Sequence, residues 1–117
     1  MRTEVRVVAA VALGGGLGGA ARHGLAAVVP GPLGTVLVNV LGCALIGVLM
    51  VVAPRLHPLA RPFLGIGVLG GFTTFSGYAL DAVRLGGLAA FAYLLATLLL
   101  AVGATFAAMA VTRRVTA

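Results

Sequence analysis

The stretch GGFTTFSGY, from Gly70 to Tyr78, places three glycines, two threonines and a serine among aromatic residues in the middle of a long apolar segment. Each glycine weakens a helix by about 1 kcal/mol relative to alanine. The hydroxyl groups offer other hydrogen-bond partners to backbone groups that leave a helix. We therefore predict a helix that is broken at mid-membrane within this stretch. The alternative is a plain kink, which needs no pair of hydroxyl-flanked aromatic residues.

The rest of the chain is built from apolar segments of similar length. Of its 117 residues, 62% are hydrophobic and 9% are charged, and the mean hydropathy is +1.21. A soluble domain of this size needs a polar exterior, whereas a helix crosses a bilayer with about 20 apolar residues. Open strand edges are not tolerated in lipid. We predict an all-α membrane protein, a single domain over residues 1–117, with four transmembrane helices at about 5–29, 33–53, 63–83 and 88–111.

The basic residues, all arginines, are distributed unevenly between the two sides of such a protein. Two arginines, Arg22 and Arg84, lie toward one side. The other six lie at the N-terminus, in the second loop and at the C-terminus, namely Arg2, Arg6, Arg55, Arg61, Arg113 and Arg114. Because positive charge favours the cytoplasmic side, we expect a multi-pass protein of the cell membrane with both termini in the cytoplasm. The arginines are not clustered on one water-exposed element, so no nucleic-acid partner is expected.

Glycines and one cysteine give further expectations about the first two segments. Gly14 and Gly18, and likewise Gly15 and Gly19, are small residues four apart, which lets helices approach closely. The formal match of this run to G-x-G-x-x-G has no βαβ context. The single Cys43 cannot form an intrachain disulfide, and redox compartment stays open. The first segment lacks the features of a signal peptide, so we expect it to remain in the mature chain.

Several polar residues lie where a bilayer would make them costly, which marks a pathway or a buried contact. Arg22 and His23 lie near the far end of the first segment. Arg22 is either an anchor that reaches the headgroups or a cation in an aqueous vestibule that concentrates anions. Asn39 lies in the second segment and shares a helix face with Thr35 and Cys43. Its amide either bonds to a neighbouring helix or lines a pathway.

The fourth segment carries Tyr93 and Thr97, four residues apart, with Thr105 further along the same face. Threonine hydroxyls in membrane helices commonly bond to their own helix, so Thr105 alone indicates little. The chain offers no nucleophile paired with a base, and its only acids are Glu4 and Asp81. Its polar groups are hydrogen-bond donors and dipoles, which points to permeation and not to an enzyme.

GGFTTFSGY, together with GTVLVN (Gly34 to Asn39) and GGAARHGL (Gly18 to Leu25), resembles the Fluc/CrcB family of fluoride channels. The resemblance covers nearly the whole chain; GG-x-TTFS is a specific motif, and the other two are weaker. It implies a subunit of an antiparallel dimer with two ion pathways. It also implies a fluoride-specific channel that lets fluoride leave the cytoplasm down its electrochemical gradient and so reduces fluoride toxicity.

The same resemblance assigns roles to particular residues. A structural sodium ion is expected on the backbone carbonyls of Gly70 and Thr73. Arg22 matches the vestibule arginine. The pore residues expected from the resemblance are Asn39, Phe75, Tyr78, Tyr93 and Thr97. Fluoride is strongly hydrated, so a pore must replace its water with donors, which Asn39, Ser76, Thr97 and the tyrosine hydroxyls supply. The positive edge of an aromatic ring, such as that of Phe75, can also face an anion.

Two features depart from the family pattern. The motif usually ends S-T-F, whereas this chain has Ser76-Gly77-Tyr78, so we expect one pathway to be weakened or altered. The arginine bias is the second, because a homodimer of dual topology needs nearly balanced charge. We therefore expect a heterodimer with a homologous subunit of opposite charge bias, inserted the other way round.

Other functions compete with this interpretation. A small multidrug transporter also has four helices and an antiparallel dimer, but it needs a glutamate embedded in the first helix. Here Glu4 lies at the helix entrance, which counts strongly against a transporter. A structural subunit without transport activity predicts no phenotype specific to fluoride. An anion channel of different selectivity is also open, because fluoride is implied by the resemblance alone.

Overall fold

The computed structural model describes residues 2–117, and all of the regular structure in this range is helical. The elements are α1 (Arg2–Val28), α2 (Pro32–Val52), the short 3-10 helix η1 (Ala53–Arg55), the π-helix η2 (Arg61–Leu69), α3 (Gly70–Phe72), α4 (Phe75–Leu85) and α5 (Gly87–Thr116). Four stretches are long and apolar enough to cross a membrane: Arg2–Val28, Pro32–Arg55, Arg61–Leu85 and Gly87–Thr116. The prediction of an all-α chain with four such helices is confirmed.

The helices run past the predicted spans at several ends. α1 begins at Arg2 instead of residue 5, and α5 continues to Thr116 instead of ending at 111. At 1.5 Å per residue, the 27 residues of α1 extend over about 40 Å, which exceeds a hydrocarbon core of about 30 Å. Hydropathy marks only the part of a helix that lipid would cover, so it misses the charged turns at the ends.

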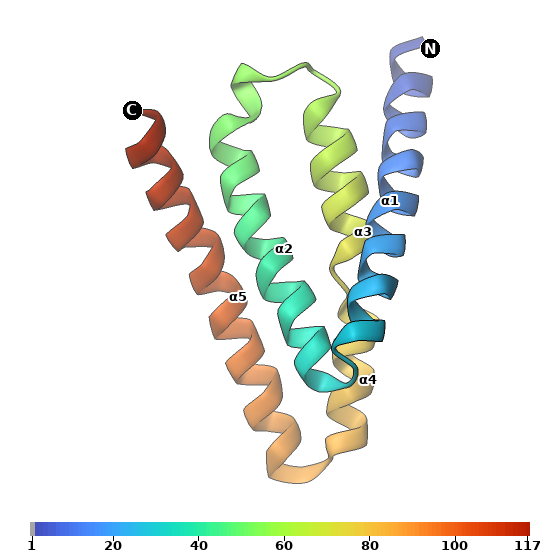
Figure 1. The fold of residues 1–117 in the computed structure, drawn as a ribbon, viewed down its shortest axis with the longest axis vertical. Coiled ribbons are helices and arrows are strands. Elements are labelled where there is room, and N and C mark those ends of the chain that lie inside the picture. The colour runs from blue at the N-terminus through green and yellow to red at the C-terminus, as the bar shows by residue number, and fades with distance from the viewer. Residues whose placement is uncertain (1) are drawn as a thin grey trace.

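The chain runs up and down between two ends (Figure 1). The N-terminus, the C-terminus and the connection between α2 and η2 lie at one end. At the opposite end, tight turns join α1 to α2 and α4 to α5. Gly86, with φ of 67°, closes α4 by donating its N–H to the Ala82 carbonyl at 3.0 Å, and this left-handed conformation favours glycine. The six arginines at the N-terminus, in the second loop and at the C-terminus therefore lie at the end of the molecule that carries both termini.

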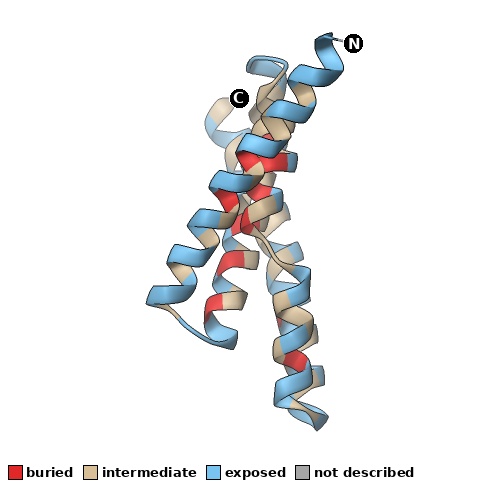
Figure 2. Ribbon diagram, turned by 90° about the vertical axis from the view of Figure 1, so that its right-hand side faces the viewer, coloured by how far each residue is buried: buried red, intermediate tan, exposed pale blue. Residues whose placement is uncertain are grey.

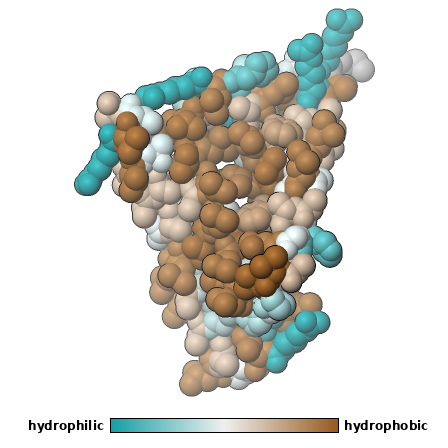
Figure 3. Space-filling view, viewed as in Figure 1, coloured by the Kyte–Doolittle hydropathy of each residue, from teal (hydrophilic) through white to brown (hydrophobic). Residues whose placement is uncertain are grey.

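The helices bury few side chains against one another (Figure 2). The buried hydrophobic residues are Val38, Leu49, Leu69, Phe72 and Ala82. Large apolar side chains are exposed on each of the four long helical stretches. Hydrophilic residues gather at the end that carries the termini and along one side of the opposite half (Figure 3). A surface of this kind suits a bilayer, in which apolar side chains need no cover from water.

Glycines bring α1 into close contact with η2 and α3. Gly14 and Gly18 are buried. A side chain at Gly14 would overlap the Phe63 carbonyl, and one at Gly18 would overlap the Val68 carbonyl. This confirms the predicted packing role of the Gly14 and Gly18 pair. Nothing lies within 4 Å of a Cβ at Gly19, so the expected contact of Gly19 is not made within this chain.

Candidate functional site

Two residues between α3 and α4 have extended backbone conformations. Thr73 has φ of −75° and ψ of 156°, and Thr74 has φ of −143° and ψ of 121°. The Thr74 N–H donates to Asn39 Oδ1 at 2.7 Å, and Asn39 Nδ2 donates to the Thr74 carbonyl at 2.9 Å. The Asn39 amide on α2 thus supplies both partners that the Thr74 backbone would otherwise find in a helix. The bond to a neighbouring segment, one of the two alternatives for Asn39, is present.

The Thr74 side chain begins α4. Its Oγ1 accepts a hydrogen bond from the Gly77 N–H at 3.0 Å, which is the usual N-cap arrangement for threonine. The Ser76 hydroxyl lies 3.3 Å from the same oxygen. A Cβ on Gly77 would lie 3.1 Å from Thr74 Cγ2, so a glycine at residue 77 leaves room for this cap.

Carbonyl groups before the Thr73–Thr74 segment have lost their usual helical donors. Within residues 2–117, the carbonyls of residues 70 to 73 accept no backbone hydrogen bond from the residues four positions later. The N–H of Thr74 is taken by Asn39, and that of Gly77 by the Thr74 side chain. The carbonyl oxygens that remain without these donors form a set of oxygen ligands suited to a cation.

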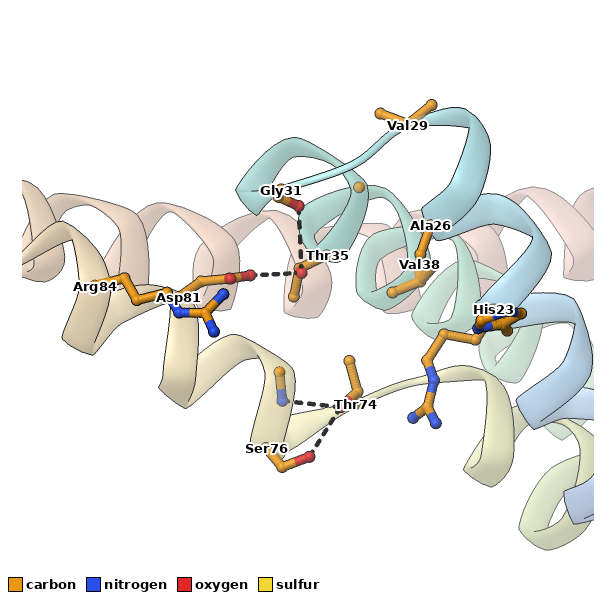
Figure 4. Close-up of a pocket in the computed structure, with 13 residues that line it drawn as sticks. His23, Ala26, Val29, Gly31, Thr35, Val38, Thr74, Ser76, Asp81 and Arg84 are labelled. Atoms are coloured by element: carbon orange, nitrogen blue, oxygen red, sulfur yellow. Dashed lines mark hydrogen bonds between the residues drawn. The ribbon is translucent and has the colours of Figure 1, made fainter.

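A polar cavity of about 380 Å³ opens beside this segment (Figure 4). Asp81 and Arg84 lie on one side of it, on α4, and His23 lies across from them on α1. Its polar lining consists of Arg22, His23, Thr35, Thr74, Ser76, Asp81 and Arg84. Arg22 is half-buried. Two arginines against one carboxylate give the lining a positive balance, which attracts anions.

Asp81 connects three helices at this cavity. Its Oδ2 accepts a hydrogen bond from Thr35 Oγ1 on α2 at 2.6 Å and one from the Tyr93 hydroxyl on α5 at 3.3 Å. Sequence reasoning noted Asp81 only as one of two acids. A signal was present, since Asp81 follows Thr74 by seven residues and so lies on the same face of a helix as the polar stretch.

A second cavity of about 310 Å³ lies at the same segment. Residues from α2, α4 and α5 and from the segment itself line it, among them Asn39, Thr73, Thr74, Phe75, Tyr78 and Thr97. Thr97 is only 4% exposed. Because Thr74 lines both cavities, the extended segment separates the charged cavity from the one that is lined by aromatic rings and hydroxyls.

Three aromatic rings contact one another in sequence from α4 to α5. The ring centroids of Phe75 and Tyr78 are 5.9 Å apart at an edge-on angle of 63°, and those of Tyr78 and Tyr93 are 5.5 Å apart. The Tyr78 hydroxyl donates to the Leu94 carbonyl, and the Tyr93 hydroxyl donates to Asp81. Both tyrosine hydroxyls therefore have partners within this chain. That they replace the water of fluoride stays a prediction.

The structure thus divides the expected site residues into groups. Asn39, Thr73, Phe75, Tyr78 and Thr97 share the second cavity. Arg22 and Ser76 line the first.

The other two expected residues line neither of these cavities. Tyr93 stacks on Tyr78 and bonds to Asp81, which connects the two groups. Gly70 begins α3 and is exposed. Among the described residues 2–117, no three His, Cys, Asp or Glu side chains come together to hold a metal ion, so any cation here would rely on backbone oxygens.

This chain matches one known protein family over most of its length. The sequence profile described as "CrcB-like protein, Camphor Resistance (CrcB)" matches residues 9–110. A protein named fluoride-specific ion channel FluC 2 from Thermobifida fusca is 63% identical over 84 residues, covering 65% of this chain and 62% of that protein. This chain therefore spans somewhat less than two thirds of the Thermobifida relative.

Two other relatives cover more of their length. Fluoride-specific ion channel FluC 1 from Streptomyces coelicolor is 51% identical, covering 97% of this chain and 82% of that protein. Fluoride-specific ion channel FluC from Paracoccus denitrificans is 45% identical, covering 88% of this chain and 91% of that protein. These relatives are named as ion channels and not as enzymes.

Proposed function

Because this chain belongs to the CrcB family, we propose that it is a subunit of a fluoride-specific ion channel of the cell membrane. The observation that carries the proposal is the cavity at the Thr73–Thr74 segment, where Asn39, Phe75 and Thr97 arrive from three different helices. Backbone that leaves the helix at membrane depth is tolerated only where protein buries it or where it lines a cavity. We place this segment at the middle of the bilayer, as the break in the third helix.

The ion path in this proposal connects the two cavities. For an ion that leaves the cytoplasm it runs from the aromatic cavity to the charged one, because the charged cavity lies toward the end opposite the termini. Arg22 and Arg84 raise the local concentration of anions in the first cavity. On its way out, fluoride exchanges water for the Thr97 hydroxyl, the remaining amide N–H of Asn39 and the ring edges of Phe75 and Tyr78, and then passes the Thr74 region and Ser76 into the charged cavity. The bond from the Tyr78 hydroxyl to the Leu94 carbonyl holds that ring in place. Fluoride leaves the cytoplasm down its electrochemical gradient, which reduces its toxicity.

A structural sodium ion fits the carbonyl groups at residues 70 to 73. These oxygens lack backbone donors within residues 2–117, and the assigned ligands, Gly70 and Thr73, are the first and last of them. Uncharged oxygens without carboxylates suit a monovalent cation. When bound, the ion would supply positive charge that offsets the carbonyl dipoles of two chains. Sodium is therefore expected to raise the stability of the dimer more than the same concentration of an organic cation.

We further propose an antiparallel dimer, formed with a homologous subunit that inserts the other way round. Six arginines belong to the end of the molecule that carries both termini, and Arg22 and Arg84 lie toward the other. Such a bias favours one orientation, with the termini in the cytoplasm. A single orientation cannot supply both halves of an antiparallel pair. The exposed ring of Phe75, with 80% of its surface uncovered in this chain, is then available to the partner's side of a shared path.

Efflux from liposomes tests the proposal. The purified chain is reconstituted alone and with a candidate homologous subunit of opposite arginine bias, and fluoride release is followed with a fluoride electrode beside a chloride control. The proposal expects rapid fluoride release without chloride release, and more from the pair than from this chain alone. Equal release of both ions would contradict fluoride selectivity. No release with any partner would favour a structural subunit, and strong release from this chain alone in both orientations would exclude the heterodimer.

A further inference from the structure

The end of the molecule that carries both termini has a groove outside the ion path. It has a volume of about 550 Å³ and lies between α1, the connection after η1 and the start of η2. Its lining is Arg6, Ala9, Ala10, Leu13, His57 and Phe63 together with neighbouring apolar residues. The groove therefore combines a cation, Arg6, with a mainly apolar lining.

The floor follows one face of α1. Ala9, Ala10 and Leu13 come three, four and seven residues after Arg6, which places all of them on the same side of a helix. The step from Arg6 to Leu13 is about 10 Å along the axis. The two alanines leave this face hollow. A chain of methylene groups laid along the face would meet alanine and leucine side chains, within two helical turns of Arg6.

His57 gives the mouth of the groove a second donor. Its Nδ1 accepts the Leu59 N–H at 3.1 Å, so in the neutral ring Nε2 carries the proton. His57 also lines an adjoining cavity together with Arg61. A third arginine of this loop, Arg55, donates to the Thr116 carbonyl at 3.1 Å and so has a partner within the chain. The mouth therefore presents Arg6 and an imidazole N–H, with Arg61 nearby.

We propose that this groove binds an anionic phospholipid, with its phosphate on Arg6 and His57 and one acyl chain along Ala9, Ala10 and Leu13. Charge complementarity selects this occupant. Basic pockets between helices at a membrane surface bind acidic headgroups, and an apolar floor that descends from the cations matches the order of a lipid. The proposal depends on the membrane-spanning helices and not on which ion the chain conducts.

Thermal unfolding in detergent with defined additives tests the site. We expect phosphatidylglycerol to raise the unfolding midpoint by several degrees more than phosphatidylcholine with the same acyl chains, and inorganic phosphate to have no such effect. Native mass spectrometry should find the acidic lipid retained on the protein. Equal effects of the two lipids would overturn the proposal. So would reproduction of the shift by phosphate alone.

Matched variants separate a built site from diffuse charge. Arg6→Gln should abolish the preference for phosphatidylglycerol, whereas Arg113→Gln, which removes one charge from the same end, should keep it. Ala9→Phe fills the groove and should also abolish the preference for phosphatidylglycerol. Ala12→Phe changes an exposed residue outside the groove and should keep this preference. If Arg113→Gln lost as much of the preference for phosphatidylglycerol as Arg6→Gln, the proposed site would not exist. If Ala9→Phe instead broke up the dimer on size exclusion, the groove would hold a second copy and the lipid proposal would be wrong.

Discussion

η2 and α3 meet α1 through glycine backbones, whereas α4, on the other side of Thr73 and Thr74, is held by side-chain hydrogen bonds. In the first region a Cβ at Gly14, Gly18 or Gly71 would overlap backbone of the neighbouring element. In the second, the polar side chains of Asn39 and Asp81 carry the contacts to α2 and α5.

The difference separates a region fixed by shape from a region fixed by polar groups. The glycine contact does not tolerate larger side chains, because close-packed backbones leave no space for a new atom. Polar contacts can be changed one at a time, and because polar groups are costly in a bilayer, those found there usually mark a functional site. We therefore expect stability to depend mainly on the glycine contact and fluoride conduction mainly on the polar region. The following four variants test this division in order of decreasing effect on stability.

Gly18→Leu should have the largest effect. The new side chain would overlap the Val68 carbonyl and the Phe72 backbone, and overpacking against rigid backbone costs about 3 kcal/mol or more. Expression followed by size exclusion should yield little folded protein. Gly19→Leu is the control, because nothing lies within 4 Å of a Cβ there. A stable Gly18→Leu protein would contradict the assigned contact.

Asn39→Leu should come second. It leaves both the N–H and the carbonyl of Thr74 without their partner, and each unsatisfied group costs about 1–3 kcal/mol. Thermal unfolding should shift clearly downward, and fluoride efflux should fall at least about tenfold, equivalent to 1.4 kcal/mol. Asn39→Asp keeps the acceptor for the Thr74 N–H and should be milder in both assays. Equal damage by the two variants would mean that the hydrogen bonds to Thr74 are not what matters.

Asp81→Asn should lower stability less than Asn39→Leu, and it should leave fluoride efflux unchanged or faster. The amide oxygen still accepts from Thr35 and Tyr93, but a neutral acceptor is weaker than a carboxylate, so stability should fall by roughly 1 kcal/mol. Removing the only acid of the charged cavity should raise the local anion concentration and leave fluoride efflux unchanged or faster. Loss of efflux at unchanged stability would instead place the carboxylate on the ion path.

Phe75→Leu should change stability least. Its ring is 80% exposed in this chain, and substitutions at such positions usually stay within about 0.5 kcal/mol. If the ring edge faces the permeating anion, efflux should nevertheless fall at least about tenfold, or 1.4 kcal/mol. Phe106→Leu, at a ring that is 66% exposed on α5, is the matched control. Normal efflux in Phe75→Leu would remove this ring from the path.

The helices could be predicted from hydropathy, and the unusual part of the third one from its composition. Glycines and hydroxyl residues between 70 and 78 mark where helix propensity is weak. The same reasoning gave no sign of the π-helix η2, because RPFLGIGVL contains no signal for that hydrogen-bond pattern. Its conformation accompanies the close contact of Gly67 with α1, which involves residues more than 50 positions away in the sequence.

The sequence identifies the site residues by their type, but it does not identify the residues with which they form hydrogen bonds. Asn39 is costly in a bilayer, which marks it, but its partner Thr74 is 35 residues away, so two interpretations stayed open. Asp81 was undervalued for the same reason, since Thr35 is 46 residues away. The tyrosine hydroxyls were expected to face an anion, and the structure directs that of Tyr78 to the Leu94 carbonyl. Which donor finds which acceptor depends on helix packing, and a single sequence does not determine it.

Access of water to the Thr73–Thr74 segment within the bilayer is the most direct test. Ser76→Cys, in a Cys43→Ser background, is treated in fluoride-conducting proteoliposomes with a membrane-impermeant anionic thiol reagent. The account predicts rapid labelling and loss of fluoride efflux, while Leu99→Cys, on the lipid-facing surface of α5, stays unlabelled. No labelling of Ser76→Cys, or full labelling that leaves efflux intact, would contradict a path along this segment.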